Sequence, residues 1–335
     1  MVERCLIVGP SWVGDMVMAQ SLFKRLKKEN PALYLAVLAP AWSEALLTRM
    51  PEVNQSIVMP VGHKQVQLGE RWRLARRIKK MNFDQAIVLP GSLKSALIPF
   101  FAGIPKRTGF VGEQRYGLLN DIRKLDKTAL PLNVERFLAL GSSDHDLPEQ
   151  IPKPVLQLDE QAQVAVREKF LLDIEKPLLA LCPGAEFGPA KQWPAEHYAA
   201  LAAEKLNAGW QVALLGSAAD KDICTEINKT CGGVCTDLSG VTSLTEVIDV
   251  LSLTDYVVSN DSGLMHIAAA LERPLAAIYG SSSPDFTPPL SENCQKIKLD
   301  LDCQPCFKRE CPMGHLDCLR KLTPELVLAE MEESA

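Results

Sequence analysis

A turn near the start of the sequence carries the first residue able to do acid–base chemistry. Residues 9–16 read Gly-Pro-Ser-Trp-Val-Gly-Asp-Met, and the two glycines have the spacing of a phosphate-binding loop. That loop needs a lysine next, whereas here Asp15 follows, and its carboxylate would repel phosphate. Asp15 can instead accept a proton from a neutral hydroxyl, or simply complement the dipole of the helix that it begins. The turn also lacks G-x-G-x-x-G, so a dinucleotide site is unsupported.

A second turn, residues 183–194, is long, rich in small residues and presents Lys191 just before a helix. Its backbone N–H groups and the single ammonium suit a pyrophosphate. The alternative is an exposed loop lysine without a ligand.

A third turn, residues 260–266, follows an apolar strand and opens a helix. Asp261 or Ser262 would cap this helix, and the N–H groups that follow would form a second anion site. His266 lies one turn further on, on the same side. The alternative is N-capping alone with a packed histidine, but two anion-suited turns in one half of the chain favour the functional interpretation.

The elements that must position these turns alternate between apolar, β-rich runs and amphipathic stretches, which is typical of βαβ units and a parallel sheet. Ligands of such sheets bind beyond the carboxyl ends of the strands, where these turns lie. The sequence therefore predicts two doubly wound α/β domains in tandem, facing a cleft, with a linker at 141–154. The expected strands are 5–8, 33–38, 85–89, 178–182, 210–215, 256–259 and 275–279, and the expected helices are 16–29, 42–50, 195–207, 243–253 and 263–271.

Composition supports an ordinary globular chain of two domains, with 335 residues, 47% hydrophobic and 23% charged. The charge is uneven: residues 1–150 hold 21 basic and 14 acidic residues, and the remainder holds 15 and 27. This asymmetry indicates that the first half meets an anionic partner, and the absence of a nucleic-acid-binding motif argues against DNA or RNA. No apolar run is long enough for a membrane span or a signal peptide, so we expect a cytoplasmic protein.

Four of the ten cysteines cluster near the end of the chain, at Cys303, Cys306, Cys311 and Cys318, with His315 between the last two. Four thiolates at short spacing suit a structural zinc ion. One or two disulfides, or reduced thiols, are the alternatives.

Across these turns the sequence resembles the bacterial ADP-heptose:lipopolysaccharide heptosyltransferases, glycosyltransferase family 9. The resemblance covers almost the whole chain, in blocks at 9–16, 39–42, 115–121, 183–194, 216–217, 260–266 and 279–289. It implies the GT-B fold of two Rossmann-like domains. The acceptor would bind an N-terminal domain, 1–155, and ADP-heptose a C-terminal domain, 156–320, which includes the Cys-rich segment 303–318. Residues 321–335 would form a helix packing back towards the N-terminal domain.

The resemblance also implies roles for single residues. Asp15 matches the family's general base, and Lys191 matches the lysine that stabilises the leaving diphosphate. Ala185 and Glu186 stand where related enzymes present two threonines, so only their backbone N–H groups can serve the phosphates. The expected donor-binding residues are Ser11, Gly14, Ala185, Glu186, Asp220, Asp261, Ser262, Gly263 and His266.

The implied reaction is an inverting transfer of L-glycero-D-manno-heptose from ADP-heptose to the first heptose of the inner core, carried by heptosyl-Kdo2-lipid A. No cofactor is required for catalysis. The acceptor's anions, and the cytoplasmic face of the inner membrane where the protein would be peripheral, would meet basic residues of the first half; the candidates are Lys94, Lys106, Arg107, Arg115, Arg123 and Lys124. A sibling enzyme with another sugar or acceptor position, or a non-catalytic binding protein, are the alternatives.

Overall fold

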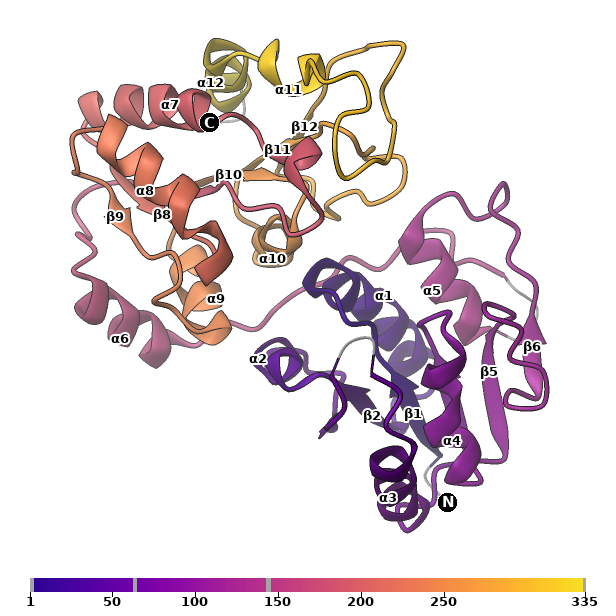
Figure 1. The fold of residues 1–335 in the computed structure, drawn as a ribbon. Coiled ribbons are helices and arrows are strands. Elements are labelled where there is room, and N and C mark those ends of the chain that lie inside the picture. Colours follow the sequence, from indigo (N-terminus) through magenta and orange to yellow (C-terminus); the bar gives the residue numbers. More distant parts are fainter. Residues whose placement is uncertain (1–2, 63–64, 143–145, 334–335) are drawn as a thin grey trace. The chain divides into compact units, whose positions relative to one another are not determined.

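The computed structural model describes residues 3–62, 65–142 and 146–333 (Figure 1). The chain divides into two compact units, Met1–Pro154 and Val155–Ala335. In the first unit the strands are β1 (Arg4–Val8), β2 (Tyr34–Ala39), β3 (Gln55–Val58), β4 (Gln85–Val88), β5 (Lys106–Phe110) and β6 (Asp121–Arg123). Its helices are α1 (Val13–Glu29), α2 (Glu44–Leu47), α3 (Leu68–Lys79), α4 (Leu97–Phe101) and α5 (Asn133–Gly141), with short 3-10 helices η1 (Ala41–Ser43) and η2 (Leu93–Ala96).

The second unit repeats this alternation. Its strands are β7 (Leu178–Cys182), β8 (Gln211–Leu214), β9 (Thr236–Asp237), β10 (Tyr256–Asn260), β11 (Leu275–Ile278) and β12 (Cys294–Ile297). Its helices are α6 (Glu160–Phe170), α7 (Ala195–Asn207), α8 (Lys221–Thr230), α9 (Leu244–Ser252), α10 (Gly263–Ala270), α11 (Asp317–Arg320) and α12 (Pro324–Glu333), with η3 (Pro189–Lys191) and η4 (Ala218–Asp220).

Each unit is built on a six-stranded parallel sheet, and the two sheets have the same topology. The strand orders are β3-β2-β1-β4-β5-β6 and β12-β11-β10-β7-β8-β9. In both, the first strand of the unit lies beside the fourth, and the winding direction reverses there. At such a switch point the loops leaving the two strands diverge, which opens a ligand-binding crevice at the carboxyl edge. The predicted α/β class with two doubly wound units is confirmed.

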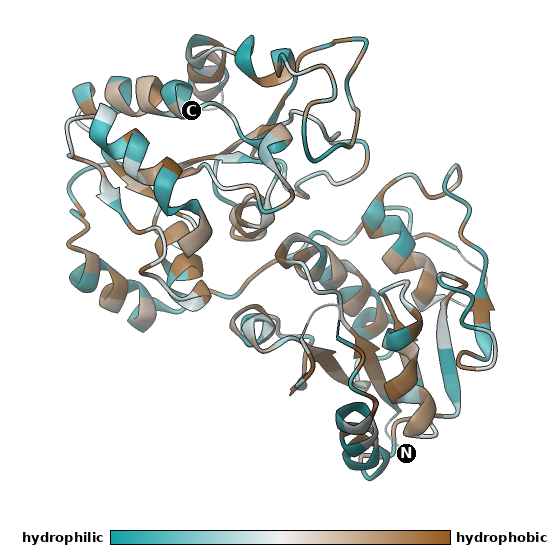
Figure 2. Ribbon diagram, viewed as in Figure 1, coloured by the Kyte–Doolittle hydropathy of each residue, from teal (hydrophilic) through white to brown (hydrophobic). Residues whose placement is uncertain are grey.

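The strands next to each switch point are buried on both faces, which is why they are apolar throughout. All five residues of β7 are buried, and so are all five of β10. In the first unit, alternate residues of β1 contribute to different faces: Leu6 and Val8 share a core cluster with Leu74 of α3 and Ile98 of α4. Figure 2 shows hydrophobic strands inside each unit, and a markedly hydrophilic α3.

One expected helix needs correction, and another is placed within its own unit. The predicted helix 42–50 is instead η1 followed by the four-residue α2. Pro51 follows it and disfavours helical backbone at the preceding residue. The helix expected within 321–335 is α12, which packs on α7, β11 and β12 through Val327 and Met331, both buried in the core of the second unit. Its packing towards the N-terminal domain stays a prediction.

Candidate active site

Asp15 lies at the switch point of the first unit, in the first turn of α1 directly after β1. Its side chain is half-buried, and the Nδ2 group of Asn133 donates a 2.9 Å hydrogen bond to its Oδ1 atom. Asn133 begins α5, 118 residues further along the chain, and α5 packs against α1. This contact orients the carboxylate, whose oxygens are hydrogen-bond acceptors, so Asp15 is suited to take a proton from a hydroxyl.

The start of α1 is accessible around Asp15. Ser11 and Trp12 are exposed, and Gly14 is half-buried. At the end of β1, Gly9 leaves room for a side chain of α1, since a Cβ atom on Gly9 would lie 2.7 Å from Cε of Met16. The predicted residues Ser11, Gly14 and Asp15 therefore share one turn at the carboxyl edge of the sheet.

In the second unit, two of the predicted turns meet at the switch point between β7 and β10. Nζ of Lys191 lies 2.5 Å from Oδ2 of Asp261, which joins the turn after β7 to the turn after β10. The Asp261 side chain is 4% exposed and that of Lys191 is 17% exposed. An ammonium has three donors, so the ion pair fixes Lys191 while N–H groups stay available for a further anion. Lys191 also lies 5.1 Å from the ring centre of Phe187.

A buried amide holds the loop that carries Lys191. Nδ2 of Asn260, at the end of β10, donates to the carbonyl oxygen of Pro183 at 2.7 Å. Its Oδ1 atom accepts from the backbone N–H of Trp193 and from the hydroxyl of Tyr198, both at 3.0 Å. One side chain thus fixes both ends of the loop 183–194 against the neighbouring strand.

The N-terminus of α10 lies on the same side of the switch point. Ser262 is its N-cap residue and Gly263 its first residue, and both are half-buried. Gly263–Ala270 spans two turns, so its first N–H groups and its dipole favour an anion here. The predicted residues Lys191, Asp261, Ser262 and Gly263 therefore lie together at one edge, which carries the Lys191–Asp261 ion pair and the first N–H groups of α10.

His266 is buried behind this edge. Its pKa is lowered from 6.5 to about 4, chiefly because of burial; the nearby Asp261 carboxylate opposes this shift and the Lys191 ammonium adds to it. The side chain is 4% exposed and is therefore neutral at pH 7. It can support the site by packing and by a hydrogen bond, without adding charge.

This burial makes the stability of the protein sensitive to mild acid. The unfolded chain takes up a proton on His266 below about pH 6.5 and the folded chain only near pH 4, so stability falls as the pH falls between those values. As the pH falls through this interval, we expect the unfolding free energy of the wild type to decrease by about 3 kcal/mol more than that of the His266→Gln variant. Denaturant unfolding of both proteins across this range measures the difference, and parallel pH curves would contradict it.

The remaining donor-binding candidates lie on neighbouring loops. Asp220 follows β8, and its Oδ2 atom accepts from the N–H and the hydroxyl of Ser217 at 2.8 and 2.7 Å. A Cβ atom on Gly184 would lie 2.5 Å from the Asp220 carboxyl carbon, so the carboxylate closely covers that glycine. Ala185 is buried and Glu186 is exposed beside it. The structure therefore groups Asp220 with the start of the Lys191 loop.

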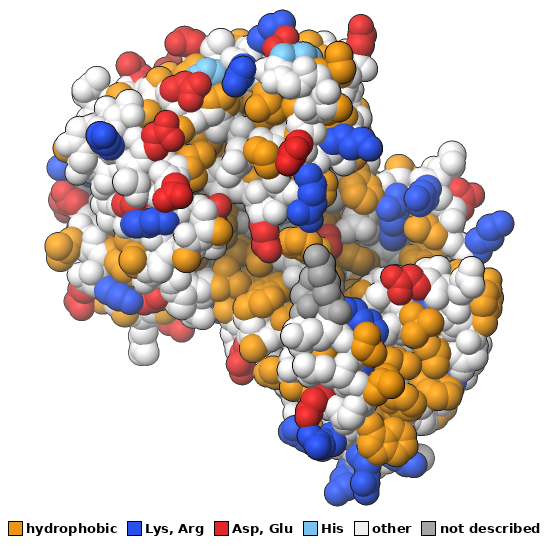
Figure 3. Space-filling model, in the orientation of Figure 1, with side chains coloured by type: hydrophobic (Ala, Val, Ile, Leu, Met, Phe, Trp, Pro, Cys, Tyr) orange, Lys and Arg blue, Asp and Glu red, His pale blue; other side chains and the backbone are white. Residues whose placement is uncertain are grey.

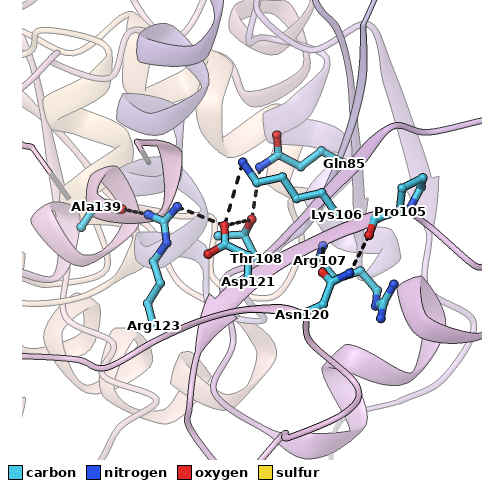
Figure 4. A network of polar contacts seen from close by, with 9 residues as sticks. All are labelled: Gln85, Pro105, Lys106, Arg107, Thr108, Asn120, Asp121, Arg123 and Ala139. Atoms are coloured by element: carbon cyan, nitrogen blue, oxygen red, sulfur yellow. Dashed lines mark hydrogen bonds and ion pairs between the residues drawn. The ribbon is translucent and has the colours of Figure 1, made fainter. Parts of the chain in front are cut away.

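Two of the predicted acceptor-binding arginines, Arg123 and Arg115, are buried and do not lie on the surface as expected. Figure 4 shows Arg123 within a polar network of β5 and β6. It is 4% exposed, donates to the carbonyl oxygen of Ala139, and lies 3.2 Å from Oδ2 of Asp121. Burial alone would raise the pKa of Asp121, but hydrogen bonds from Arg123 and Thr108 hold it below its usual range. Arg123 is a structural residue and not a surface cation.

Arg115 is also structural. It is 1% exposed, and its guanidinium donates to the carbonyl oxygens of Pro90 and Phe110 and to the hydroxyl of Ser95. Burial lowers its pKa to about 10. Arg107 is half-buried and donates to the carbonyl oxygens of Leu118 and Ile104. Lys94 is half-buried, and Lys106 and Lys124 are exposed.

The cysteine cluster gives a second correction. Cys303, Cys306, Cys311, Cys318 and His315 help to line one small cavity of about 20 Å³. Within the described residues, however, no group of three or more His, Cys, Asp or Glu side chains is arranged to hold a metal ion, so the expected zinc finds no support. All ten cysteines are described, and all are free thiols.

The thiols of the cluster differ in acidity. The backbone N–H of Leu316 lowers the pKa of Cys311, with smaller contributions from the N–H groups of Met313, Gly314 and His315. Burial, together with the neighbouring cysteines, raises the pKa of Cys318 to about 11. Since the thiolate is the reacting form, we expect iodoacetamide at pH 7 to alkylate Cys311 more than ~10-fold faster than Cys318. Peptide mass spectrometry over time measures both rates; Cys311→Ser should lose the fast phase, and faster labelling of Cys318 would contradict the assignment.

Sequence reasoning missed three residues that support the site: Asn133, which orients Asp15, Asn260, which fixes the Lys191 loop, and Phe187 beside Lys191. Asn260 belongs to the turn 260–266, but the contacts of its buried amide are visible only in the structure. Asn133 lies in no motif that would connect it with Asp15.

The chain has two doubly wound parallel units. One carries a carboxylate at its switch point, and the other carries a lysine and a helix N-terminus at its switch point. This combination is typical of glycosyltransferases of the two-Rossmann-domain class. Comparison with known proteins narrows the class further. The family model for glycosyltransferase family 9 (heptosyltransferase) matches residues 71–317, and the chain belongs to this family. It is therefore a glycosyltransferase.

Individual relatives agree over nearly the full length. The chain is 48% identical to lipopolysaccharide heptosyltransferase 2 of Salmonella typhimurium, over 98% of this chain and 97% of the relative. It is 47% identical to the protein of the same name from Escherichia coli, with the same coverage. The solved structure of E. coli ADP-heptose lps heptosyltransferase II superposes with a TM-score of 0.89 at 45% identity, covering 99% of this chain and 98% of that one.

Proposed function

We propose that this protein transfers L-glycero-D-manno-heptose from ADP-heptose to the first heptose of the lipopolysaccharide inner core. The observation that carries this proposal is the edge of the second unit at the switch point between β7 and β10. There Lys191 and the N-terminus of α10 offer one cation and a set of N–H groups. A diphosphate matches that chemistry. The relatives named lipopolysaccharide heptosyltransferase 2, at 47 and 48% identity, support a heptose as the sugar and a lipopolysaccharide as the acceptor.

The chemistry of the transfer needs two charges of opposite sign. As the bond from C1 of the heptose to the diphosphate breaks, positive charge develops on the sugar and negative charge on the leaving ADP. Lys191 stabilises the leaving group, and the Asp261 carboxylate keeps its ammonium in place. The α10 N–H groups add a fixed dipole that costs no reorganisation during the reaction.

Asp15 acts on the acceptor. Its carboxylate takes the proton of the attacking heptose hydroxyl while that oxygen bonds to C1, so the new bond forms as the old one breaks. Attack from the face opposite the leaving ADP inverts the configuration at C1. Asn133 holds the carboxylate through Oδ1. The carboxylate of Asp15 and the ammonium of Lys191 both belong to this chain, and the proposed reaction uses no cofactor.

The acceptor is a lipid, so the proposed place of action is the cytoplasmic face of the inner membrane, with the protein bound peripherally. Among the helices in the described ranges, none combines the length and apolar character that a membrane crossing requires.

One assay tests the function. Purified protein is incubated with ADP-heptose and with Kdo2-lipid A acceptors that carry either no heptose or one heptose, and product mass is measured. We expect addition of one heptose to the monoheptosyl acceptor only. Transfer to the acceptor without heptose, or to neither, would contradict the proposed acceptor position and support a sibling activity or a binding protein.

A further inference from the structure

An aromatic surface lies on the first unit where α3 and α4 pack together. Trp72 and Phe101 meet edge to face with ring centres 5.3 Å apart, and Phe100 lies 5.7 Å from Phe101. Trp72 is 50% exposed, Phe100 is 40% exposed and Leu68 is 56% exposed. We define Leu68, Trp72, Phe100 and Phe101 as the aromatic surface. Single exposed apolar residues are ordinary, but a contiguous group that includes Trp and Phe marks an interaction site.

The exposed side of α3 changes from apolar to basic towards the C-terminus of the helix. Leu68, Trp72 and Arg76 follow each other at intervals of four along α3, and Lys80 comes next directly after the helix. The opposite face of α3 is buried through Leu74, Ala75 and Ile78. The same row therefore passes from apolar to cationic. The exposed cations of α3 and its C-terminus are Arg73, Arg76, Arg77, Lys79 and Lys80.

Within α3, opposing charge is limited to one residue. Glu70 is the single acid within α3, and it forms an ion pair with Arg73. Glu113 accepts a hydrogen bond from the backbone N–H of Leu93, in the η2 helix that leads into α4. The guanidinium of Arg107 lies over the Phe100 ring at 5.6 Å and adds one more cation. Figure 3 shows the apolar side chains gathered over α3 and α4, with Lys and Arg beside them over α3.

We propose that this surface binds an anionic phospholipid bilayer. Trp and Phe rings partition to the boundary between headgroups and acyl chains, and Arg and Lys beside them meet lipid phosphates. Charge complementarity favours this partner, because the cations outnumber the acids and lie directly beside the apolar group. The inference rests on the proposed function in one respect: an enzyme whose acceptor is a lipid acts at a membrane surface.

Vesicle sedimentation without donor or acceptor tests the surface. The intact protein is mixed with vesicles of phosphatidylglycerol and phosphatidylcholine, or of phosphatidylcholine alone. We expect binding to the anionic vesicles, weakened by high salt because screening acts on exposed charges. The variant Arg76→Gln/Arg77→Gln/Lys80→Gln should lower the partition coefficient by about 100-fold, since each basic residue near an anionic surface contributes about fivefold.

The matched control, Lys229→Gln/Lys298→Gln/Lys308→Gln, removes three exposed charges from the second unit and should bind as wild type does. Trp72→Ser should weaken binding to the anionic vesicles, and a melting curve shows whether the variant is folded. Equal binding by the charge variant and the control would overturn the proposal. A wild-type dimer that the Trp72→Ser substitution converts to a monomer, without vesicle binding, would also overturn it in favour of a second copy as the partner.

A transfer assay with a soluble, deacylated acceptor separates this inference from the proposed function. The charge variant should keep wild-type turnover on that substrate, because α3 contributes no residue to the proposed chemistry. Vesicle binding by a protein that transfers to neither acceptor would overturn the proposed function and leave the membrane surface intact. Loss of soluble turnover in the charge variant would show that these residues serve catalysis, and would overturn their assignment to lipid alone.

Discussion

Asp15→Asn is expected to lower kcat by about 10²- to 10⁴-fold while ADP-heptose still binds. The amide has the shape of the carboxylate and can still accept the hydrogen bond from Asn133, so the turn keeps its geometry. It cannot take a proton from the acceptor hydroxyl, which is the step assigned to this residue. Steady-state transfer rates measured by product mass, with donor affinity measured by calorimetry, separate the two effects.

Asp84→Asn is the matched control for that variant. Asp84 belongs to the same unit, but it directly precedes β4 and accepts a hydrogen bond from the N–H of Arg4 at the amino edge of the sheet. Its substitution removes one carboxylate far from the carboxyl edge and should leave turnover near the wild-type value. If Asp15→Asn retains more than about a tenth of wild-type kcat, Asp15 is not the general base.

Lys191→Met is expected to lower kcat by about 10²- to 10³-fold, because the leaving diphosphate loses its cation. The same change leaves Asp261, 4% exposed, without its counter-charge, which costs about 3–5 kcal/mol of folding free energy. The double variant Lys191→Met/Asp261→Asn removes the uncompensated charge. It should recover most of the stability and none of the turnover, as melting curves and transfer rates measure.

The control for Lys191 is Lys169→Met, which breaks an ion pair of the same 2.5 Å length between Lys169 and Glu246 on helices α6 and α9. That pair is more exposed, so it contributes little to stability and nothing to the proposed reaction. Recovery of turnover in the double variant would show that Lys191 acts through stability alone, and would remove it from the leaving-group role.

Strands and turns next to the two switch points could be predicted from the sequence because burial on both faces makes them apolar. β1, β7 and β10 are of this kind, and the turns after them carry the candidate residues. The outer strands could not be predicted in the same way. β5 reads Lys-Arg-Thr-Gly-Phe and β12 reads Cys-Gln-Lys-Ile, so neither shows a continuous apolar run. β9 has only two residues.

Charge in a sequence does not reveal which arginines meet solvent. Arg115 and Arg123 have the sequence surroundings of surface cations, but carbonyl groups from distant segments enclose them. Arg115 donates to Pro90, 25 residues away, and Arg123 donates to Ala139, 16 residues away. Conversely, the basic segment that forms α3 lies on the surface, because its apolar face is narrow and its basic residues fall on the other side. For Arg115 and Arg123, burial is the result of tertiary contacts and not of the local sequence pattern.

The amide of Asn260 has a consequence for inhibitors of this enzyme. Asn260 holds Pro183 and Trp193 at once, and the backbone of Ala190 between them is hydrogen-bonded to Arg309 and Ser281, so a ligand meets a segment that is fixed at several points. Compounds shaped for the segment Gly184–Gln192 would therefore meet a rim whose backbone has little freedom to adapt to them. Resistance by remodelling this rim would require loss of a buried hydrogen-bonding centre, and the variant would lose thermal stability together with its sensitivity to the drug.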